Sequence, residues 1–467
     1  MSAAQLTPQD TVDNVLALAA QAGADGCVVL VDETSSANLR WANNTLTTNG
    51  AMRGSRITVI ATVGAGEGTA AGVVGRSSTT GDSLPEVVAA AVAAARESSP
   101  AEDARPLVDG SVGPGWEQEP GETSVRVYES FAPALGEALV KAGKENRWLY
   151  GFADHEVTTT YVGSSTGLRL RHEQPSGYVS VTGKSGDLSQ SAWVGSATRD
   201  FADIDATALD AELTRRLGWA TRTVAVEAGR HNTVLPPAAV ADLTTYLYWQ
   251  MEGRDAHEGR NVYSNPSGGS RIGEQLSPHP VNLRSLPHYA GLECSPFVTA
   301  RSSGGSQSVF DNGLTLSATD WIRGGKLQHL MQNRFSADLT GNPVTPMIGN
   351  YVLEVEGATG SVDDLVAGVD HGLLLTCLWY IRTVDEQTLL LTGLTRDGVY
   401  LIENGEVTGA VNNFRFNESP VDLLSRFTAA GETVPSFSRE WGDYFPRTAT
   451  PPLLVPDFNM SSTSQAS

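Results

Sequence analysis

Two runs of alternating apolar and polar side chains, residues 156–162 and 168–172, face each other across the glycine- and serine-rich segment 163–167. Alternation with a period of two places every second side chain on one face of an extended strand, and a glycine-rich turn lets two such strands fold back on each other. The pattern therefore predicts a β hairpin, to which residues 177–181 add another strand. It restricts this part of the chain to an antiparallel sheet.

Helices are predicted on both sides of this hairpin. The segment 83–97 begins with Ser83, Pro85 and Glu86, a helix-start signal in which Glu86 stands where a capping box needs an acidic residue. Apolar periodicity predicts further helices over residues 11–22, 125–146 and 205–221, and strands over residues 27–31 and 56–63.

Gly64, Gly66 and Gly68 follow the second of these strands. Glycines this close together can form a phosphate-binding loop or a hairpin turn. Their spacing is not the dinucleotide-binding fingerprint, no Lys-Ser or Lys-Thr pair follows, and the next segment has the pattern of a returning strand. A hairpin turn is therefore predicted.

The order of the elements predicts an α+β fold in several parts. We expect a mixed α/β domain over residues 1–100, a linker over residues 101–123, a central antiparallel-sheet domain with helices over residues 124–228, and a large strand-rich C-terminal domain over residues 229–459. The serine-rich end, residues 460–467, is expected to be disordered.

The net charge argues against some classes of binding partner, and the cysteine spacing argues against some kinds of site. The chain has 53 Asp and Glu against 32 Lys and Arg, a formal net charge of -21, which repels nucleic acid phosphates and anionic membranes. Neither a signal peptide nor a membrane-spanning apolar stretch is expected, so we predict a cytoplasmic protein. Cys27, Cys294 and Cys377 lie far apart, which argues against a disulfide framework and against a cysteine-rich zinc site.

Four segments resemble landmarks of the TldD/PmbA family in their order and intervals: residues 38–44, 311–315, 324–327 and 400–407. The resemblance spans nearly the whole chain. It implies a two-subunit peptidase in which a TldD-type subunit carries zinc, whereas a TldE (PmbA) type subunit lacks the metal and completes a closed substrate chamber.

The histidines place this chain with the metal-free type. Its three His-Glu pairs are His155-Glu156, His172-Glu173 and His257-Glu258, and none is followed by a second His at helical spacing. Two His about a helical turn apart can share one metal ion, and a Glu between them can take a proton from bound water, so the missing second His leaves the motif open.

The resemblance also implies where the zinc ligands would stand. A TldD-type subunit carries a His-Glu-x-x-x-His motif on the helix that corresponds to residues 238–251, and its third ligand is a Cys that corresponds to the segment 438–445. Residues 243–250 read Leu-Thr-Thr-Tyr-Leu-Tyr-Trp-Gln, and the segment 438–445 has no Cys. We therefore expect no metal and no cofactor in this chain, and zinc in the partner subunit.

No catalytic residue is expected in this chain, but His257, Glu258 and Cys377 are the residues that an unconventional site would use. The pair His257-Glu258 lies in a polar segment typical of an exposed loop or helix end. Cys377 lies in an apolar run typical of a buried strand, where a free thiol is a small apolar side chain. A nucleophilic role would need a nearby base and an electropositive setting.

The substrate-binding residues cannot be identified from a motif. An extended peptide can add to a sheet edge through main-chain hydrogen bonds, which requires no diagnostic side chain. Three aromatic residues of the predicted helix could line a peptide chamber or fill the space that zinc ligands vacate, and one arginine could contact substrate or form a solvated ion pair with Asp385 or Glu386. These weak candidates are Tyr246, Tyr248, Trp249 and Arg382.

The sequence thus predicts a TldE-like, metal-free subunit that pairs with a TldD-type zinc peptidase subunit to degrade or trim unfolded or leader peptides. An extended peptide is the expected substrate, and neither nucleic acid nor membrane is an expected partner. Two alternatives remain open. One is a stand-alone hydrolase with an unconventional site, and the other is a homodimeric peptide-binding or regulatory protein, including the gyrase-modulating role associated with the family name.

Overall fold

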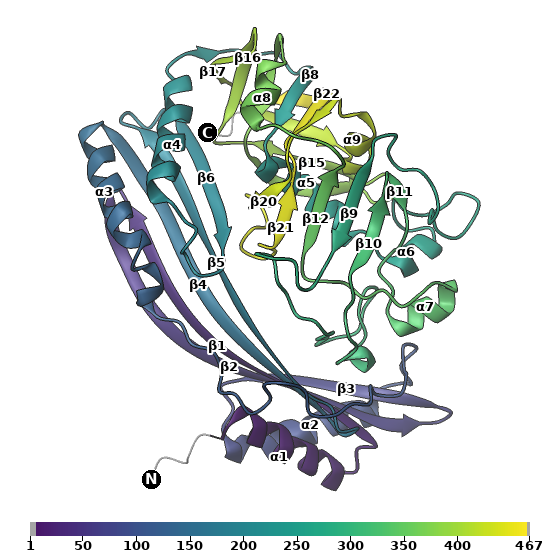
Figure 1. The fold of residues 1–467 in the computed structure, drawn as a ribbon. Helices are drawn as coiled ribbons and strands as arrows, with labels where there is room; N and C mark the ends of the chain where they lie inside the picture. Colours follow the sequence, from purple (N-terminus) through teal and green to yellow (C-terminus); the bar gives the residue numbers. More distant parts are fainter. Residues whose placement is uncertain (1–5, 465–467) are drawn as a thin grey trace.

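A six-stranded antiparallel sheet of long, curved strands forms one side of the molecule (Figure 1). The structure is a computed structural model that describes residues 6–464. The strand order is β3 (Gly68–Ser77), β2 (Thr45–Ala65), β1 (Gly26–Ala42), β4 (Arg147–Ser164), β5 (Arg169–Ser185) and β6 (Ser191–Thr198). The regions before and after the predicted linker 101–123 each contribute three strands to this sheet, which they therefore share.

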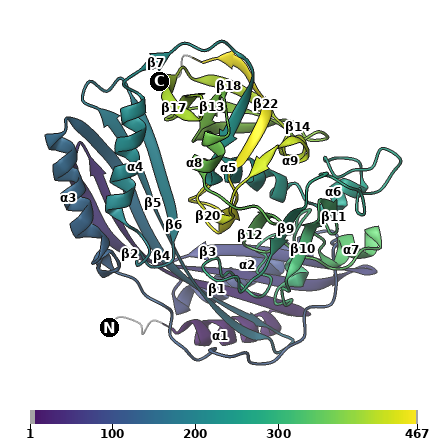
Figure 2. The ribbon, with the colours of Figure 1, turned by 45° about the horizontal axis from the view of Figure 1, so that its top comes forward.

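Helices cover the outer face of the sheet near both of its ends (Figures 1 and 2). They are α1 (Pro8–Gln21), α2 (Leu84–Glu97), α3 (Phe131–Lys144) and α4 (Ala206–Trp219), with short 3₁₀ turns η1 (Gly81–Ser83) before α2 and η2 (Val125–Tyr128) before α3. The predicted capping box is corrected: Thr80 and Ser83 form a capping box at η1, and the Ser83 side chain does not cap α2.

The side chains of β1 show why its residues 27–31 are apolar without interruption. Val29 packs under α1 and α2, and Trp41 packs farther along the same face under α3. Leu30 points to the opposite face, where it meets Phe310 of the C-terminal part of the chain. A strand that is buried on both faces needs apolar residues at successive positions rather than at every second one.

The predicted hairpin forms from β4 and β5, but two other predictions need correction. Residues 177–181 are not a separate strand, because they continue β5, which stays paired with β4 along its whole length. Residues 460–463 are not disordered, because β22 (Leu453–Thr463) includes them and pairs with β18 (Phe414–Glu418). The last three residues, 465–467, lie outside the described part of the chain.

The C-terminal part contains two further sheets. The smaller has the order β11 (Lys326–Leu327), β10 (Thr319–Arg323), β9 (Val281–Ser285), β12 (Tyr351–Val355), β21 (Thr448–Thr450) and β20 (Val434–Ser436). The larger has the order β14 (Leu378–Asp385), β15 (Leu390–Thr395), β18, β22, β8 (Gly229–Leu235), β13 (His371–Leu375), β16 (Val399–Glu403), β17 (Glu406–Val411) and β7 (Thr223–Val224), with β19 (Ala429–Ala430) beside β22. The α+β class is confirmed.

Helix α5 (Pro237–Trp249) lies at the centre of this part, and its side chains belong to the largest apolar cluster together with residues of both sheets. Residues 239–248 are all buried. An α-helix without an exposed polar face needs apolar partners on every side, and here the two sheets and a neighbouring helix supply them. The remaining short helices are α6 (Gly253–His257), α7 (Arg334–Thr340), α8 (Val362–Ala367) and α9 (Pro420–Arg426), together with the buried 3₁₀ turn η3 (Val309–Asp311).

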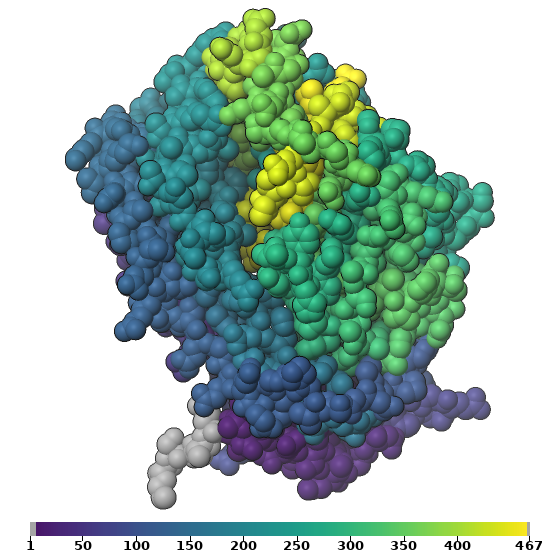
Figure 3. Space-filling view, viewed as in Figure 1, coloured from purple at the N-terminus to yellow at the C-terminus, as the bar shows by residue number. Residues whose placement is uncertain are grey.

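The C-terminal part is seated against the inner face of the long sheet, and the atoms of the two parts meet along much of the boundary visible in Figure 3. An ion pair between Arg301 and Asp32, with an N···O distance of 2.6 Å, joins them near the start of β1. A cluster of Trp193, Cys377 and Phe437 joins them near β6. Within residues 6–464, no helix combines the length and the apolar character needed to cross a membrane.

Candidate functional site

Helix α5 and the segment 438–445 come into direct contact, as the family resemblance requires of the two elements that would hold zinc in a TldD-type subunit. Strand β8 ends at Leu235, and two prolines, Pro236 and Pro237, turn the chain into α5. Proline suits the first helical turn because the N–H that it lacks has no partner inside the helix. The segment 438–445 lies against α5 through hydrogen bonds to Asp242.

Asp242 is a fully buried carboxylate that ties three pieces of chain together. Its Oδ1 accepts hydrogen bonds from the Ser438 hydroxyl at 2.6 Å and from the Glu440 N–H at 3.0 Å. Its Oδ2 accepts a hydrogen bond from the N–H of Leu378 at 3.2 Å. Burial raises the pKa of Asp242 to about 7, although these three donors favour the charged form and oppose the rise.

Glu440 is the second carboxylate of this site and is also saturated by donors. It accepts hydrogen bonds from the N–H groups of Tyr380 at 3.0 Å and Ile381 at 3.2 Å, and its Oε1 lies 3.3 Å from Nη1 of Arg382. Arg382 therefore pairs with Glu440, not with Asp385 or Glu386. The Arg382 side chain is 62% exposed, so this ion pair adds little stability.

Aromatic rings occupy the rest of the contact between α5 and the segment 438–445. The rings of Trp249 and Trp441 meet edge to face with their centroids 5.0 Å apart, and those of Tyr246 and Trp441 lie 5.9 Å apart. The Tyr246 hydroxyl donates to the carbonyl of Ile381 at 2.8 Å. These side chains pack against one another and fill the space between the helix and the segment.

Tyr248 also lies on α5 and is completely buried. Its hydroxyl donates to the carbonyl of Ile348 at 2.7 Å and accepts from the N–H of the same residue at 3.2 Å. Its ring packs against Trp321 and Tyr351. Tyr248 is therefore part of the core and does not line a surface that a substrate could reach.

The variant Tyr248→Phe is expected to lower the free energy of unfolding by about 1–3 kcal/mol, because it leaves the buried Ile348 groups without their partner. Peptide binding is expected to stay unchanged. Urea unfolding and a peptide titration of the same preparation measure both quantities. A loss of peptide affinity at unchanged stability would contradict the assignment of Tyr248 to the core.

The variant Asp242→Asn is expected to alter the pH dependence of stability. The folded-state pKa of Asp242, about 7, lies above the value of about 3.9 in an unfolded chain, so the folded state binds more protons between these two values. The stabilisation is fully present below about pH 4 and is lost as the pH rises through about 7. Asparagine does not titrate, so the wild type should lose stability relative to the variant by at most about 1.4 kcal/mol per pH unit in this window. Parallel curves of unfolding free energy against pH would contradict this assignment.

The residues at this contact do not fit a zinc ion. Structural and catalytic zinc sites use at least three Cys, His, Asp or Glu ligands. The facing side chains here are aromatic, and the two carboxylates, Asp242 and Glu440, already accept hydrogen bonds from N–H and O–H donors. Over residues 6–464, no three His, Cys, Asp or Glu side chains gather closely enough to hold a metal ion.

The structure does not bring the three residues of the alternative catalytic site together, because His257 and Glu258 lie at the end of α6 and Cys377 lies in a buried cluster elsewhere. His257 is exposed at the end of α6, a helix that packs against α7. Glu258 forms ion pairs with Arg254, at 3.0 Å, and with Arg260. Cys377 is fully buried beside Trp193 and Phe437, and burial raises the pKa of its thiol, which disfavours the reactive thiolate.

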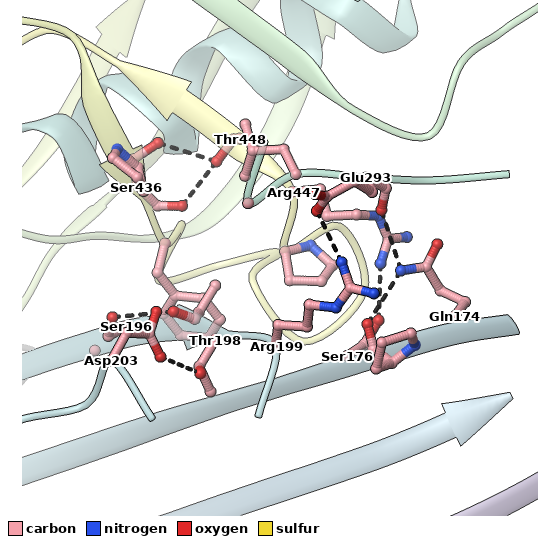
Figure 4. A pocket seen from close by; sticks show the side chains of 18 residues that line it. Gln174, Ser176, Ser196, Thr198, Arg199, Asp203, Glu293, Ser436, Arg447 and Thr448 are labelled. Carbon is pink, nitrogen blue, oxygen red and sulfur yellow. Dashed lines mark hydrogen bonds and ion pairs between the residues drawn. The ribbon is translucent and has the colours of Figure 1, made fainter. Parts of the chain in front are cut away.

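A cavity of about 160 Å³ opens between the long sheet and the C-terminal part (Figure 4). Strand β6 and the residues after it form one wall, and β20 with the segment before β21 forms the opposite wall. Both β6 and β20 are edge strands of their sheets. The polar side chains that line the cavity are Gln174, Ser176, Ser196, Thr198, Arg199, Asp203, Glu293, Ser436, Arg447 and Thr448.

Sequence reasoning missed Asp242, Glu440 and Arg447. Asp242 is the single acidic residue of a helix that is otherwise mostly apolar, and this was a usable signal. A carboxylate on a helix that is buried on all sides needs hydrogen-bond donors from neighbouring segments. Glu440 and Arg447 gave no such signal. Their roles depend on contacts with residues far away in the sequence.

Comparisons with known proteins agree with these observations. A family model described as the PmbA/TldA metallopeptidase C-terminal domain matches residues 228–462. The structure of TldE from Thermococcus kodakarensis is similar, with 16% identity, a TM-score of 0.77, and coverage of 96% of this chain and 99% of that one. No match was found among curated proteins.

Two structures described as putative modulators of DNA gyrase are also similar. The one from Thermotoga maritima has 16% identity, a TM-score of 0.75, and coverage of 97% of this chain and 100% of that one. The one from Bacteroides thetaiotaomicron has 15% identity, a TM-score of 0.76, and coverage of 97% and 98%. At such low identity these likenesses concern the fold alone. Because the family model covers about half of the chain, this protein belongs to the TldD/PmbA family.

Proposed function

We propose that this chain is the metal-free, TldE-like subunit of a two-subunit peptidase, and that zinc is carried by a TldD-type partner. The pair degrades or trims unfolded or leader peptides in the cytoplasm. The metal-free chain completes the substrate chamber and holds the extended peptide, while the partner supplies the metal and its general base.

The observation that carries the proposal is the contact between α5 and the segment 438–445. A TldD-type subunit is expected to place two His, a Glu and a Cys on these two elements, whereas this chain places Tyr246, Trp249 and Trp441 there. Hydrogen bonds to Asp242 hold the two elements together without a metal. The contact therefore has a structural role in this chain, and hydrolysis is assigned to the partner.

Co-expression with the TldD-type chain of the same organism tests the proposal. We expect the two chains to purify as a complex that cleaves an unfolded peptide, and we expect neither chain to cleave it alone. The variants His257→Ala, Glu258→Gln and Cys377→Ala of this chain should leave the activity of the complex intact. Replacing the first His of the partner's zinc motif should abolish it.

Two results would overturn the proposal. One is hydrolysis by this chain alone that Cys377→Ala abolishes, which would indicate a stand-alone hydrolase. The other is a chain that purifies from its native host as a homodimer without a TldD-type subunit, which would indicate a binding or regulatory protein.

A further inference from the structure

The cavity in Figure 4 lies where two sheets present their free edges to each other. Within the described chain, β6 pairs only with β5, and β20 pairs only with β21. An edge strand has main-chain N–H and C=O groups that another extended segment can pair with. Here the two edges border one cavity, so a segment that enters it could reach either of them.

Contacts of β6 show which of its groups face outward. The guanidinium of Arg216 on α4, a helix that packs on the sheet face, donates to the carbonyl of Trp193 at 2.6 Å. A carbonyl group lies in the plane of the sheet, so this guanidinium reaches the carbonyl at the free edge of β6. Main-chain groups alternate between the two edges of a strand, which places those of Gly195 and Ala197 on the same free edge.

Gly195 lets two aromatic rings pack closely against this part of β6. A Cβ atom at this position would clash with the ring of Trp193 and would lie 2.7 Å from the ring of Phe437. Any side chain would have to displace one of these rings, so glycine lets both rings pack closely. Both Gly195 and Phe437 line the cavity.

Arg447 is the cation of the cavity that has no ion pair among the described residues. Its Nε donates to the carbonyl of Gly349 at 3.1 Å, and its Nη1 donates to the Ser176 hydroxyl at 2.8 Å. A guanidinium has five N–H donors, so further donors remain. Within residues 6–464, no carboxylate forms an ion pair with it, and burial lowers its pKa.

Of the other charged groups of the cavity, two form an ion pair and the third, Asp203, is hydrogen-bonded to a neutral hydroxyl. Glu293 lies 3.2 Å from Nη1 of Arg199, and Asp203 accepts a hydrogen bond from the hydroxyl of Thr198. Arg447 and Asp203 therefore take part in no ion pair within the described residues, and the Arg447 guanidinium keeps N–H donors that no carboxylate accepts. Arg447 is partly buried, and a carboxylate with two oxygens can accept two of its remaining N–H donors in a charge-assisted pair.

We propose that this cavity binds an extended peptide that adds to the free edge of β6 and places a carboxylate against Arg447. The inference rests on the proposed peptide-holding function and names the class of substrate: peptides with a carboxylate at one defined position. A strand advances about 3.3 Å per residue, so residues 195–198 can pair with about four residues of the peptide. The carboxylate belongs either to the C-terminus of the peptide or to an Asp or Glu side chain.

Fluorescence anisotropy with labelled peptides of about six residues tests the proposal on the full chain. One peptide has a free C-terminal carboxylate, a second ends in an amide, and a third ends in an amide but has an internal Asp. If the terminal carboxylate is the ligand, we expect the first peptide to bind at least about tenfold more tightly than the other two. If a side-chain carboxylate is the ligand, the first and second should bind equally and the third more tightly.

The variant Arg447→Gln should remove this preference and weaken binding of the favoured peptide about tenfold or more, with little effect on the amide without Asp. Arg323→Gln is the matched control, because the Arg323 side chain is 76% exposed on β10, outside the cavity. Methylation of alternate peptide nitrogens requires no change in the protein. Methyl groups on the nitrogens whose N–H groups pair with β6 should abolish binding. Methyl groups on the intervening nitrogens, which point away from β6, should leave binding intact.

Equal binding of all three peptides, or unchanged binding to Arg447→Gln, would overturn the proposal, as would a chain that binds none of them. These outcomes differ from those that test pairing with a TldD-type subunit. If the chain forms the active complex but binds peptides equally well with and without a carboxylate, the proposed function stands and this inference is wrong. If the chain binds the carboxylate peptides but forms no complex with a TldD-type subunit, this peptide site stands and the proposed function is wrong.

Discussion

Replacing Asp242 with alanine is expected to lower the free energy of unfolding by about 3–5 kcal/mol, a large effect for a single substitution. The substitution removes a carboxylate that accepts hydrogen bonds from Ser438, Glu440 and Leu378, all in the interior. Each donor then loses its acceptor at that site, and a small cavity remains. Urea unfolding at pH 7, followed by fluorescence, measures the loss.

Ser438→Ala is the matched control for this prediction. It removes one of the three hydrogen bonds and leaves the carboxylate with two donors, so the expected loss is only about 1–2 kcal/mol. If Asp242→Ala were as stable as the wild type, the carboxylate would not hold α5 and the segment 438–445 together. The structural account of the missing zinc site would then fail.

Replacing Trp193 with alanine is expected to destabilise the protein by about 3–5 kcal/mol and to make Cys377 reactive. The ring of Trp193 stacks on Phe437 with a centroid distance of 6.2 Å, and the guanidinium carbon of Arg439 lies 5.0 Å from its centroid. Trp193 also packs beside the thiol of Cys377. Removing the ring therefore opens the contact between β6 and the C-terminal part at the place where that thiol lies.

Mass spectrometry after brief treatment with a thiol reagent measures how far each cysteine has been labelled, and labelling of Cys377 would show this opening. Cys27 and Cys294 are also buried and should stay unlabelled in both proteins. Trp148→Ala is the control, because Trp148 lies on β4 and takes no part in the cluster around Cys377. Labelling of Cys377 in the wild type, or its absence in Trp193→Ala, would contradict this packing.

Much of the fold could be predicted from the sequence because long antiparallel strands have a visible alternation. The limits of β1 could not, because polar residues such as Asp32 and Ser35 follow its apolar run 27–31. Main-chain pairing with β2 on one side and β4 on the other holds this half extended. Such pairing does not depend on the side chains, and the same reason explains why the serine-rich end of β22 is a strand.

The predicted break before residue 177 failed for a related reason. Pro175 and Gly177 suggest a turn, yet both lie within β5. Proline lacks an N–H and is tolerated in a strand where that edge is unpaired. The pairing of β5 with β6 begins only at Gly177, so Pro175 stands beside a free edge and does not interrupt the ladder with β4.

The candidate site was predictable only in what it lacks. The sequence shows that α5 and the segment 438–445 have no His and no Cys, and that α5 carries the aromatic residues Tyr246 and Trp249. Their roles were not. Tyr248 is one residue from Trp249 but is completely buried in the core, whereas Trp249 is only partly buried. The surroundings of Arg447 form only where β6 and β20 approach each other.

The zinc content of the purified chain, alone and in complex with a TldD-type subunit, tests the central claim most directly. Elemental mass spectrometry against protein concentration should give a ratio near zero for the chain alone and about one zinc per partner subunit in the complex. The variants His257→Ala and Cys377→Ala of this chain should leave the second ratio unchanged. A ratio of about one zinc for the chain alone would contradict the account and would make His257, Glu258 and Cys377 the first residues to test as ligands.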